Sequence, residues 1–131
     1  MAQHDIEVIL IRQWASYLTL PVFLADPDGN VLFYNEPAEA LLGRPYDEAG
    51  QMPISELARV FETTAQDGRP IPSSELPIAV ALRELRPKHD RLRMKALDGP
   101  WHTIEVTAFP IEGRGERHLG VVAIFWDAND A

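Results

Sequence analysis

Four residues have the side-chain types that acid–base or nucleophilic catalysis uses. Asp26 and Asp28 flank a proline and precede a glycine, a pattern typical of a turn in which Asp bonds local backbone. Ser73 and Ser74 stand where a helix would begin, without the glycines that surround a nucleophilic serine. Paired catalytic carboxylates would also need a cleft with two opposed environments, which the sequence does not indicate. We therefore expect a non-enzymatic protein with no catalytic residues.

The chain contains no cysteine. This absence excludes disulfides, thiolate metal sites, iron–sulfur clusters, a cysteine nucleophile and any flavin attached through cysteine. His89 follows Pro87 in a polar turn, His102 begins an expected strand and His118 borders a loop. We expect surface or edge positions for these histidines and no metal site.

Composition limits the possible partners. A chain of 131 residues with 46% hydrophobic and 24% charged residues is typical of one globular domain. Its formal net charge of −8 makes it a poor partner for nucleic acid. Residues 83–95 nevertheless carry six Lys or Arg against two acidic residues, which predicts either a solvated helix end with an edge strand or an anion site. No run reaches the roughly 20 apolar residues that cross a bilayer, and no secretory signal pattern is present, so we expect a cytoplasmic protein without a membrane partner.

The periodicity first predicts an N-terminal helix. Apolar residues recur at helical spacing between Asp5 and Leu18, and they spread over an arc that one flat surface would hardly cover. The helix is therefore expected to lie in a deep groove or to be wedged between its own domain and a second copy. A turn at 26–30 then joins two short strands into a hairpin, and Asn35 is placed to cap the next helix.

The remaining elements complete an α+β order. Prolines and glycines between residues 44 and 72 predict irregular structure with one or two helical turns. A clearer helix follows to about Leu85, and alternating or apolar runs predict strands at 91–97, 102–109 and 119–126. We therefore expect a five-stranded antiparallel sheet with helices on one face. The N-terminal helix would pack on the other face or across a dimer.

Three groups of segments in this order resemble the PAS sensor family. The first has a hairpin turn, an Asn that heads a helix, a small residue three positions later, two leucines and a glycine. The second is similar to the lead into the long PAS helix, and the third to the last two strands. The segments are 24–43; 67–72 with 75–79; and 98–102 with 105–111 and 120–127.

The resemblance implies a sensory or signalling module, usually fused to kinase, cyclase, phosphatase or transcription-factor domains. An Asp in this family commonly marks the junction to an output helix, and here only four residues follow Asp127. The chain is thus expected to be a free-standing PAS protein or an excised fragment. We divide it into an N-terminal helix (1–19), a PAS domain (20–127) and a polar tail (128–131).

The resemblance also frames the cofactor question. PAS haem sensors generally hold iron through a histidine on or near the long helix, and residues 74–85 contain none. We therefore expect no cofactor, and the alternative is a haem- or noncovalent flavin-binding sensor of gas or redox state.

A small apolar or amphipathic molecule between the long helix and the sheet is the other expected ligand. The competing interpretation is that the same residues simply fill the core. The candidate pocket residues, chosen from strand alternation and helix face, are Phe33, Leu76, Val80, Leu92, Met94, Ile104 and Val106.

Partner binding is the third prediction. Apolar residues of the N-terminal helix and of the last strand could form one surface that joins two copies in a symmetric homodimer. An unidentified signalling protein is the other expected partner. The candidate dimer interface is Ile9, Trp14, Leu18, Val122, Ile124 and Trp126.

Overall fold

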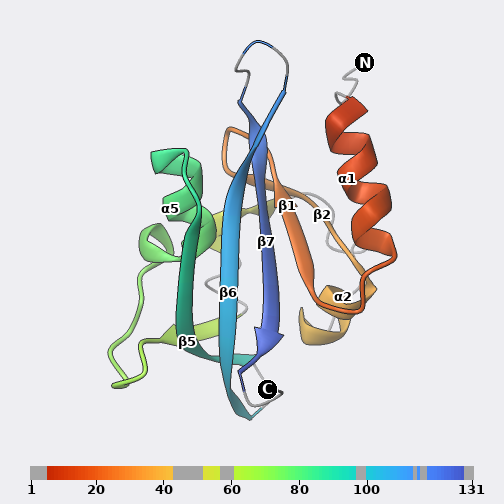
Figure 1. The fold of residues 1–131 in the computed structure, drawn as a ribbon. Coiled ribbons are helices and arrows are strands. Elements are labelled where there is room, and N and C mark those ends of the chain that lie inside the picture. The colour runs from red at the N-terminus through yellow and green to blue at the C-terminus, as the bar shows by residue number, and fades with distance from the viewer. Residues whose placement is uncertain are drawn as a thin grey trace.

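The computed structural model describes residues 6–42, 52–56, 61–96, 100–113, 115 and 118–128. Figure 1 shows the long strands side by side, with α1 on the right of the view and α5 on the left. No helix within these ranges is long and apolar enough to span a bilayer. In chain order the elements are α1 (Ile6–Ser16), β1 (Val22–Ala25), β2 (Asn30–Tyr34), α2 (Glu36–Leu42), β3 (Met52–Pro53), β4 (Phe61–Thr64), the 3-10 helix η1 (Ser73–Glu75), α5 (Pro77–Glu84), β5 (Lys88–Ala96), β6 (Trp101–Glu112) and β7 (His118–Asp127).

The strands of the described ranges form one antiparallel sheet in the order β3-β2-β1-β7-β6-β5-β4. The five predicted strands are β1, β2, β5, β6 and β7, and the predicted α+β architecture is confirmed. The strand count was wrong, because β3 and β4 add two short strands in the stretch that was expected to be irregular. They pair with the edges of β2 and β5, and such long-range pairing leaves little local pattern in the sequence.

One face of the sheet and the helices α2 and α5 enclose an inner core. The ring of Phe23 lies at its centre, 5.6 Å from the ring of Tyr34 and 5.1 Å from that of Phe125. From α5, Ile78 and Ala81 are buried against this cluster. The helices therefore cover one face, as predicted.

The helix α1 packs on the opposite face of the sheet and encloses an outer core. Ala15 is 1% exposed, and Ile11 and Leu18 pack beside it. Alternation along β1 divides the two cores, because Val22 and Leu24 face α1 whereas the residues between and after them face inward. The sheet residues of the outer core are Val22, Leu24, Leu32, Phe33, Phe109, Ile111, Leu119, Val122 and Ile124.

A β-bulge between β1 and β2 changes the direction of one predicted pocket residue. Leu24 pairs with Phe33, but Ala25 pairs with Val31, so Leu32 is an extra residue in β2. Val31 faces the inner core, and strict alternation would bring Phe33 there too. The bulge instead places Phe33 with the outer core, where the Arg12 guanidinium lies 4.9 Å from the centre of its ring.

The predicted turn between β1 and β2 is present. One carboxylate oxygen of Asp26 accepts hydrogen bonds from the N–H groups of Asp28 and Asn30, both at 2.9 Å. Gly29 has a φ of 88°, which glycine adopts without steric cost. The Asp26 carboxylate thus stabilises the turn of the hairpin.

Gly120 allows β7 to approach β1 closely. Its φ is 137°, and a Cβ atom there would lie 2.0 Å from the carbonyl oxygen of Ala25. Any other residue would therefore push the central pair of strands apart.

Candidate functional site

An apolar cavity of about 30 Å³ lies in the inner core between the sheet and the η1–α5 segment. Thr63 contributes the polar side chain of its lining, and its hydroxyl lies 3.5 Å from the Ile71 carbonyl oxygen. This volume is about that of one water molecule, and the walls suit apolar contents. The lining residues are Phe23, Thr63, Leu76, Pro77, Ile78, Leu92, Met94, Val106 and Phe125.

The structure brings part of the predicted pocket to this cavity. Ile104 belongs to the inner core but lines a neighbouring groove instead. Val80 is buried on α5 outside the lining, and Phe33 lies on the opposite face because of the bulge. The four predicted residues in the lining are Leu76, Leu92, Met94 and Val106.

Two phenylalanines in the lining were not predicted from the sequence. Phe23 and Phe125 lie in the apolar runs of β1 and β7, which are buried on both faces. A continuous apolar run does not show which of its residues face which side. The register of β1 against β7, in which Phe23 pairs with Ala123, would have been needed to place these two side chains on the inner face.

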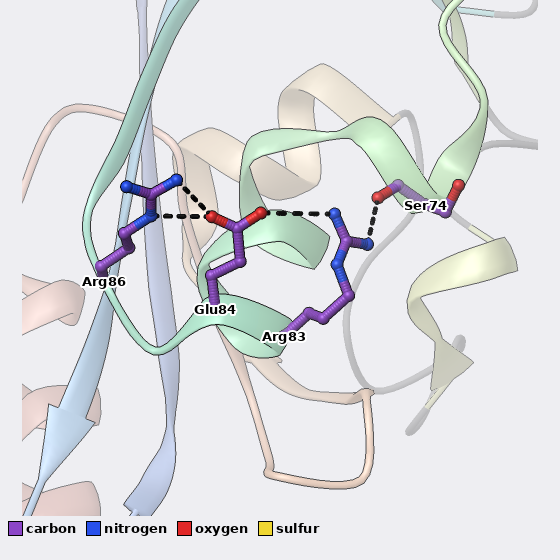
Figure 2. Close-up of polar contacts among 4 residues, drawn as sticks. All are labelled: Ser74, Arg83, Glu84 and Arg86. Carbon is purple, nitrogen blue, oxygen red and sulfur yellow. Dashed lines mark hydrogen bonds and ion pairs between the residues drawn. The ribbon is translucent and has the colours of Figure 1, made fainter.

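Charged side chains hold the η1–α5 wall of the cavity in place. The Arg83 guanidinium donates to the Ser74 carbonyl oxygen at 2.9 Å and so ties the last turn of α5 to η1. Figure 2 shows Glu84 between the guanidinium groups of Arg83 and Arg86. The hydrogen bond from Arg86, followed by its charge, lowers the pKa of the Glu84 carboxyl. Part of the basic run at 83–95 therefore has a structural role at the end of α5.

A larger groove of about 290 Å³ opens where β7 ends and β6 begins. Residues 19–21, which link α1 to β1, form one of its walls, and the N–H of Phe125 donates to the Pro21 carbonyl oxygen at 3.0 Å. Phe125 also lines the inner cavity. The groove residues are Thr19, Leu20, Pro21, Leu41, His102, Ile104, Phe125, Trp126 and Asp127.

The helix α1 keeps a second apolar side that faces solvent. Leu10 is 55% exposed and Trp14 45% exposed, although Ala15 on the opposite side is buried. Of the predicted interface, Ile9 and Trp14 lie on this exposed side, whereas Val122 is 1% exposed beneath α1. The exposed residues are Ile6, Ile9, Leu10, Trp14 and, one position after the helix, Tyr17.

The other predicted interface residues have contacts within the chain. Leu18 and Ile124 are half-buried in the outer core. The Trp126 indole N–H donates to a carboxylate oxygen of Glu105 at 3.2 Å. The structure therefore divides the predicted set into three groups. Ile9 and Trp14 lie on the exposed side of the helix, Trp126 lines the groove, and the outer core holds Leu18, Val122 and Ile124.

Asn35 joins α1 to the domain. Its amide N–H groups donate to the carbonyl oxygens of Ala15 and Leu20, both at 2.9 Å. Its amide oxygen accepts from the N–H of Val22 at 3.0 Å and from that of Ala38 at 3.2 Å. The contact with Ala38 is the predicted cap of α2, and the other three connect the end of α1, its linker and β1.

Glu105 is the centre of a polar cluster on β5, β6 and β7. Its carboxylate lies 3.2 Å from His89 Nε2 and 3.7 Å from a guanidinium nitrogen of Arg91. The hydrogen bond with His89 is the largest of the causes that lower the pKa of Glu105, and Arg91 and Trp126 add to it. His89 is thus paired with Glu105, outside the cavity. Within the described ranges, no group of three or more His, Cys, Asp or Glu side chains could hold a metal ion.

Comparisons with known proteins agree with this fold. A family model described as PAS domain matches residues 19–130. The chain superposes with a TM-score of 0.64 on the PAS domain of a Colwellia psychrerythraea protein, with 20% identity and with 97% of this chain and 100% of that chain covered. The score is 0.71 for the PAS domain of the fruit-fly ELK potassium channel (12% identity, 92% and 96% covered) and 0.70 for the Rhodobacter sphaeroides LOV protein (12%, 95% and 68%). No curated protein sequence gives a significant match.

Proposed function

Because the chain belongs to the PAS domain family, we propose that it is a sensory or signalling module that forms a homodimer through α1 and acts on a partner protein. The observation that carries the dimer is the two-sided helix. One side of α1 is already buried against its own sheet, and the opposite side still exposes large apolar residues. Exposed apolar patches of this kind usually mark interaction sites.

The exposed side suits a second copy of the same chain. When the helix is viewed down its axis at 100° per residue, its exposed side covers an arc of about 140°, with Ile9 at one edge and Trp14 at the other. Within Ile6–Tyr17 no charged residue falls in this arc, and Gln13 is its polar member. A two-fold axis places a patch against itself, so an uncharged patch brings no like charges into contact across the interface.

Sedimentation of the wild type and two variants tests the dimer. Leu10→Glu puts a charge in the centre of the exposed side and should yield a folded monomer. Ala40→Glu adds the same charge at an exposed position of α2 and should leave the dimer intact. A wild-type protein that sediments as a monomer, or a Leu10→Glu variant that still dimerises, would refute the proposed interface.

A second candidate function is sensing of a small apolar molecule in the inner cavity. It is favoured by the apolar lining around an internal space. The space of about 30 Å³ is far below the roughly 300–1,000 Å³ of typical ligand pockets. A ligand therefore requires movement of a wall.

Haem and flavin fit the described cavity poorly. No histidine of the described ranges lines it, and Thr63 alone among its lining residues has a polar side chain. His89 is paired with Glu105, and His102 lines the groove. We therefore favour an apolar or amphipathic molecule over either cofactor.

Native mass spectrometry of freshly purified protein separates these possibilities in one spectrum. A bound small molecule would add its own mass to the chain, and haem or flavin would add a mass that identifies it. A dimer without added mass would favour the interaction module over the ligand sensor.

A further inference from the structure

Phe125 separates the inner cavity from the groove at the end of the sheet. It is 9% exposed, and it lines both spaces. Its ring meets the Phe23 ring edge-on, at 63° between the planes. Phe23 lines the cavity and does not line the groove. Of these two rings beside the cavity, that of Phe125 is therefore the one that also borders the groove.

The groove offers room for the Phe125 ring to turn away from the cavity. The groove measures about 290 Å³, and its wall near Phe125 includes Leu41 and Ile104. A ring that moved into this space would keep apolar neighbours. It would also leave behind, next to the cavity, a space of the size and shape of a phenyl ring.

We propose that the cavity and the groove are two parts of one ligand site and that Phe125 is the gate between them. The ligand is an amphipathic molecule with one aromatic ring or a short alkyl chain, which enters the cavity, and a polar end that stays in the groove. This inference rests on the ligand-sensing candidate above. It adds the route of entry, the orientation of the ligand and the nature of its polar end.

The polar side chains of the groove indicate the nature of that end. Thr19, His102 and Asp127 supply a hydroxyl, an imidazole and a carboxylate. The carboxylate and the chain's formal charge of −8 disfavour an anion. The polar end is therefore a neutral or cationic hydrogen-bonding group.

The same geometry connects the ligand with α1. The groove wall formed by residues 19–21 is the linker that follows α1, and the backbone N–H of the gate residue is bonded to Pro21. Asn35 holds the neighbouring Leu20 carbonyl. A ligand in the groove therefore contacts the segment that positions the proposed dimer helix.

Two matched substitutions test the gate with benzene as the probe. Phe125→Ala and Phe23→Ala each remove one phenyl ring beside the cavity, but only the first also opens the cavity to the groove. We expect both variants to bind benzene, with association to Phe125→Ala more than about tenfold faster because no conformational step precedes entry. Proton NMR line shapes of benzene measure both the affinity and the exchange rate.

The outcomes distinguish the gate from the cavity. Equal association rates in the two variants would overturn the gate and leave ligand binding in the cavity standing. Failure of both folded variants to take up benzene would overturn the cavity as a ligand site and the gate with it. Phe125→Leu, which keeps an apolar side chain in β7, serves if the alanine variant does not fold, and it too should exchange benzene faster than Phe23→Ala.

The orientation of the ligand has its own test. With Phe125→Ala, benzylamine should bind more tightly than benzoate, and Asp127→Asn should reduce that preference. A preference for benzoate, or one that does not change in Asp127→Asn, would overturn the assignment of the polar end to the groove.

Discussion

Asn35 allows the attachment of α1 to be tested by two substitutions of the same side chain. Asn35→Ala removes all four of its hydrogen bonds. Asn35→Asp keeps an oxygen for the N–H groups of Val22 and Ala38, but it lacks the amide N–H groups that bind the carbonyls of Ala15 and Leu20. The two variants therefore separate the cap of α2 from the link to α1.

The expected loss of stability follows from the groups left without partners. In Asn35→Ala the buried Val22 N–H loses its partner, and an unsatisfied buried group costs about 1–3 kcal/mol. The Ala15 carbonyl loses the Asn35 amide but still accepts from the Leu18 N–H at 3.1 Å. Loss of the cap at Ala38 adds about 1 kcal/mol. The free energy of unfolding should thus fall by about 2–4 kcal/mol, a substantial part of the roughly 5–15 kcal/mol typical of a domain.

Hydrogen–deuterium exchange measured on peptides from α1 and α2 provides the assay, with urea unfolding as the measure of global stability. Asn35→Ala should raise exchange in both helices. Asn35→Asp should raise exchange in α1 while α2 keeps its protection, because a carboxylate still caps that helix and is repelled by the two carbonyls at the end of α1. An Asn35→Asp protein whose α1 is as protected as in the wild type would show that this side chain does not hold the helix.

Two further predictions concern the sheet. Gly120→Ala should lower the free energy of unfolding in urea by at least about 2 kcal/mol, because its Cβ would overlap the Ala25 carbonyl. The control is Gly115→Ala, whose Cβ meets no atom within 4 Å and which should therefore cost clearly less. Equal losses of stability in the two variants would contradict the argument. Because the folded pKa of Glu105 lies below its usual value of 4.5, through His89 above all, its contribution to stability is present above that value and is lost as the pH falls through the folded pKa. Glu105→Gln should therefore flatten the pH dependence of urea unfolding below about pH 4.5, and an unchanged profile would count against the cluster.

Local patterns in the sequence predicted the elements that depend on neighbouring residues. The turn at 26–30, the cap at Asn35 and the five predicted strands all follow from residue types a few positions apart. The predicted tail 128–131 begins with Ala128, whose N–H donates to the Thr103 carbonyl, and its last three residues lie outside the described ranges.

Features that depend on distant pairing were not predicted. The bulge that turns Phe33 outward arises from the register of β1 against β2. The contacts of Asn35 with Ala15 and Leu20 span 20 and 15 positions. The local sequence that identifies Asn35 as a helix cap does not indicate these distant partners. The position of Phe125 between two hollows likewise requires that β6, β7, α5 and the α1 linker be assembled first.

A homodimer through α1, as proposed, would make protein abundance part of the mechanism. In the proposed dimer, the same helix is held by its own sheet and by its partner, so the docked form of α1 and the dimer stabilise each other by mass action. At low protein concentration the monomer would predominate, and α1 would be held by its own sheet alone. At high concentration the dimer would predominate, and the partner would hold α1 as well. The module would thus respond to its own concentration as well as to any ligand, and a change in expression would shift the same equilibrium that a signal shifts.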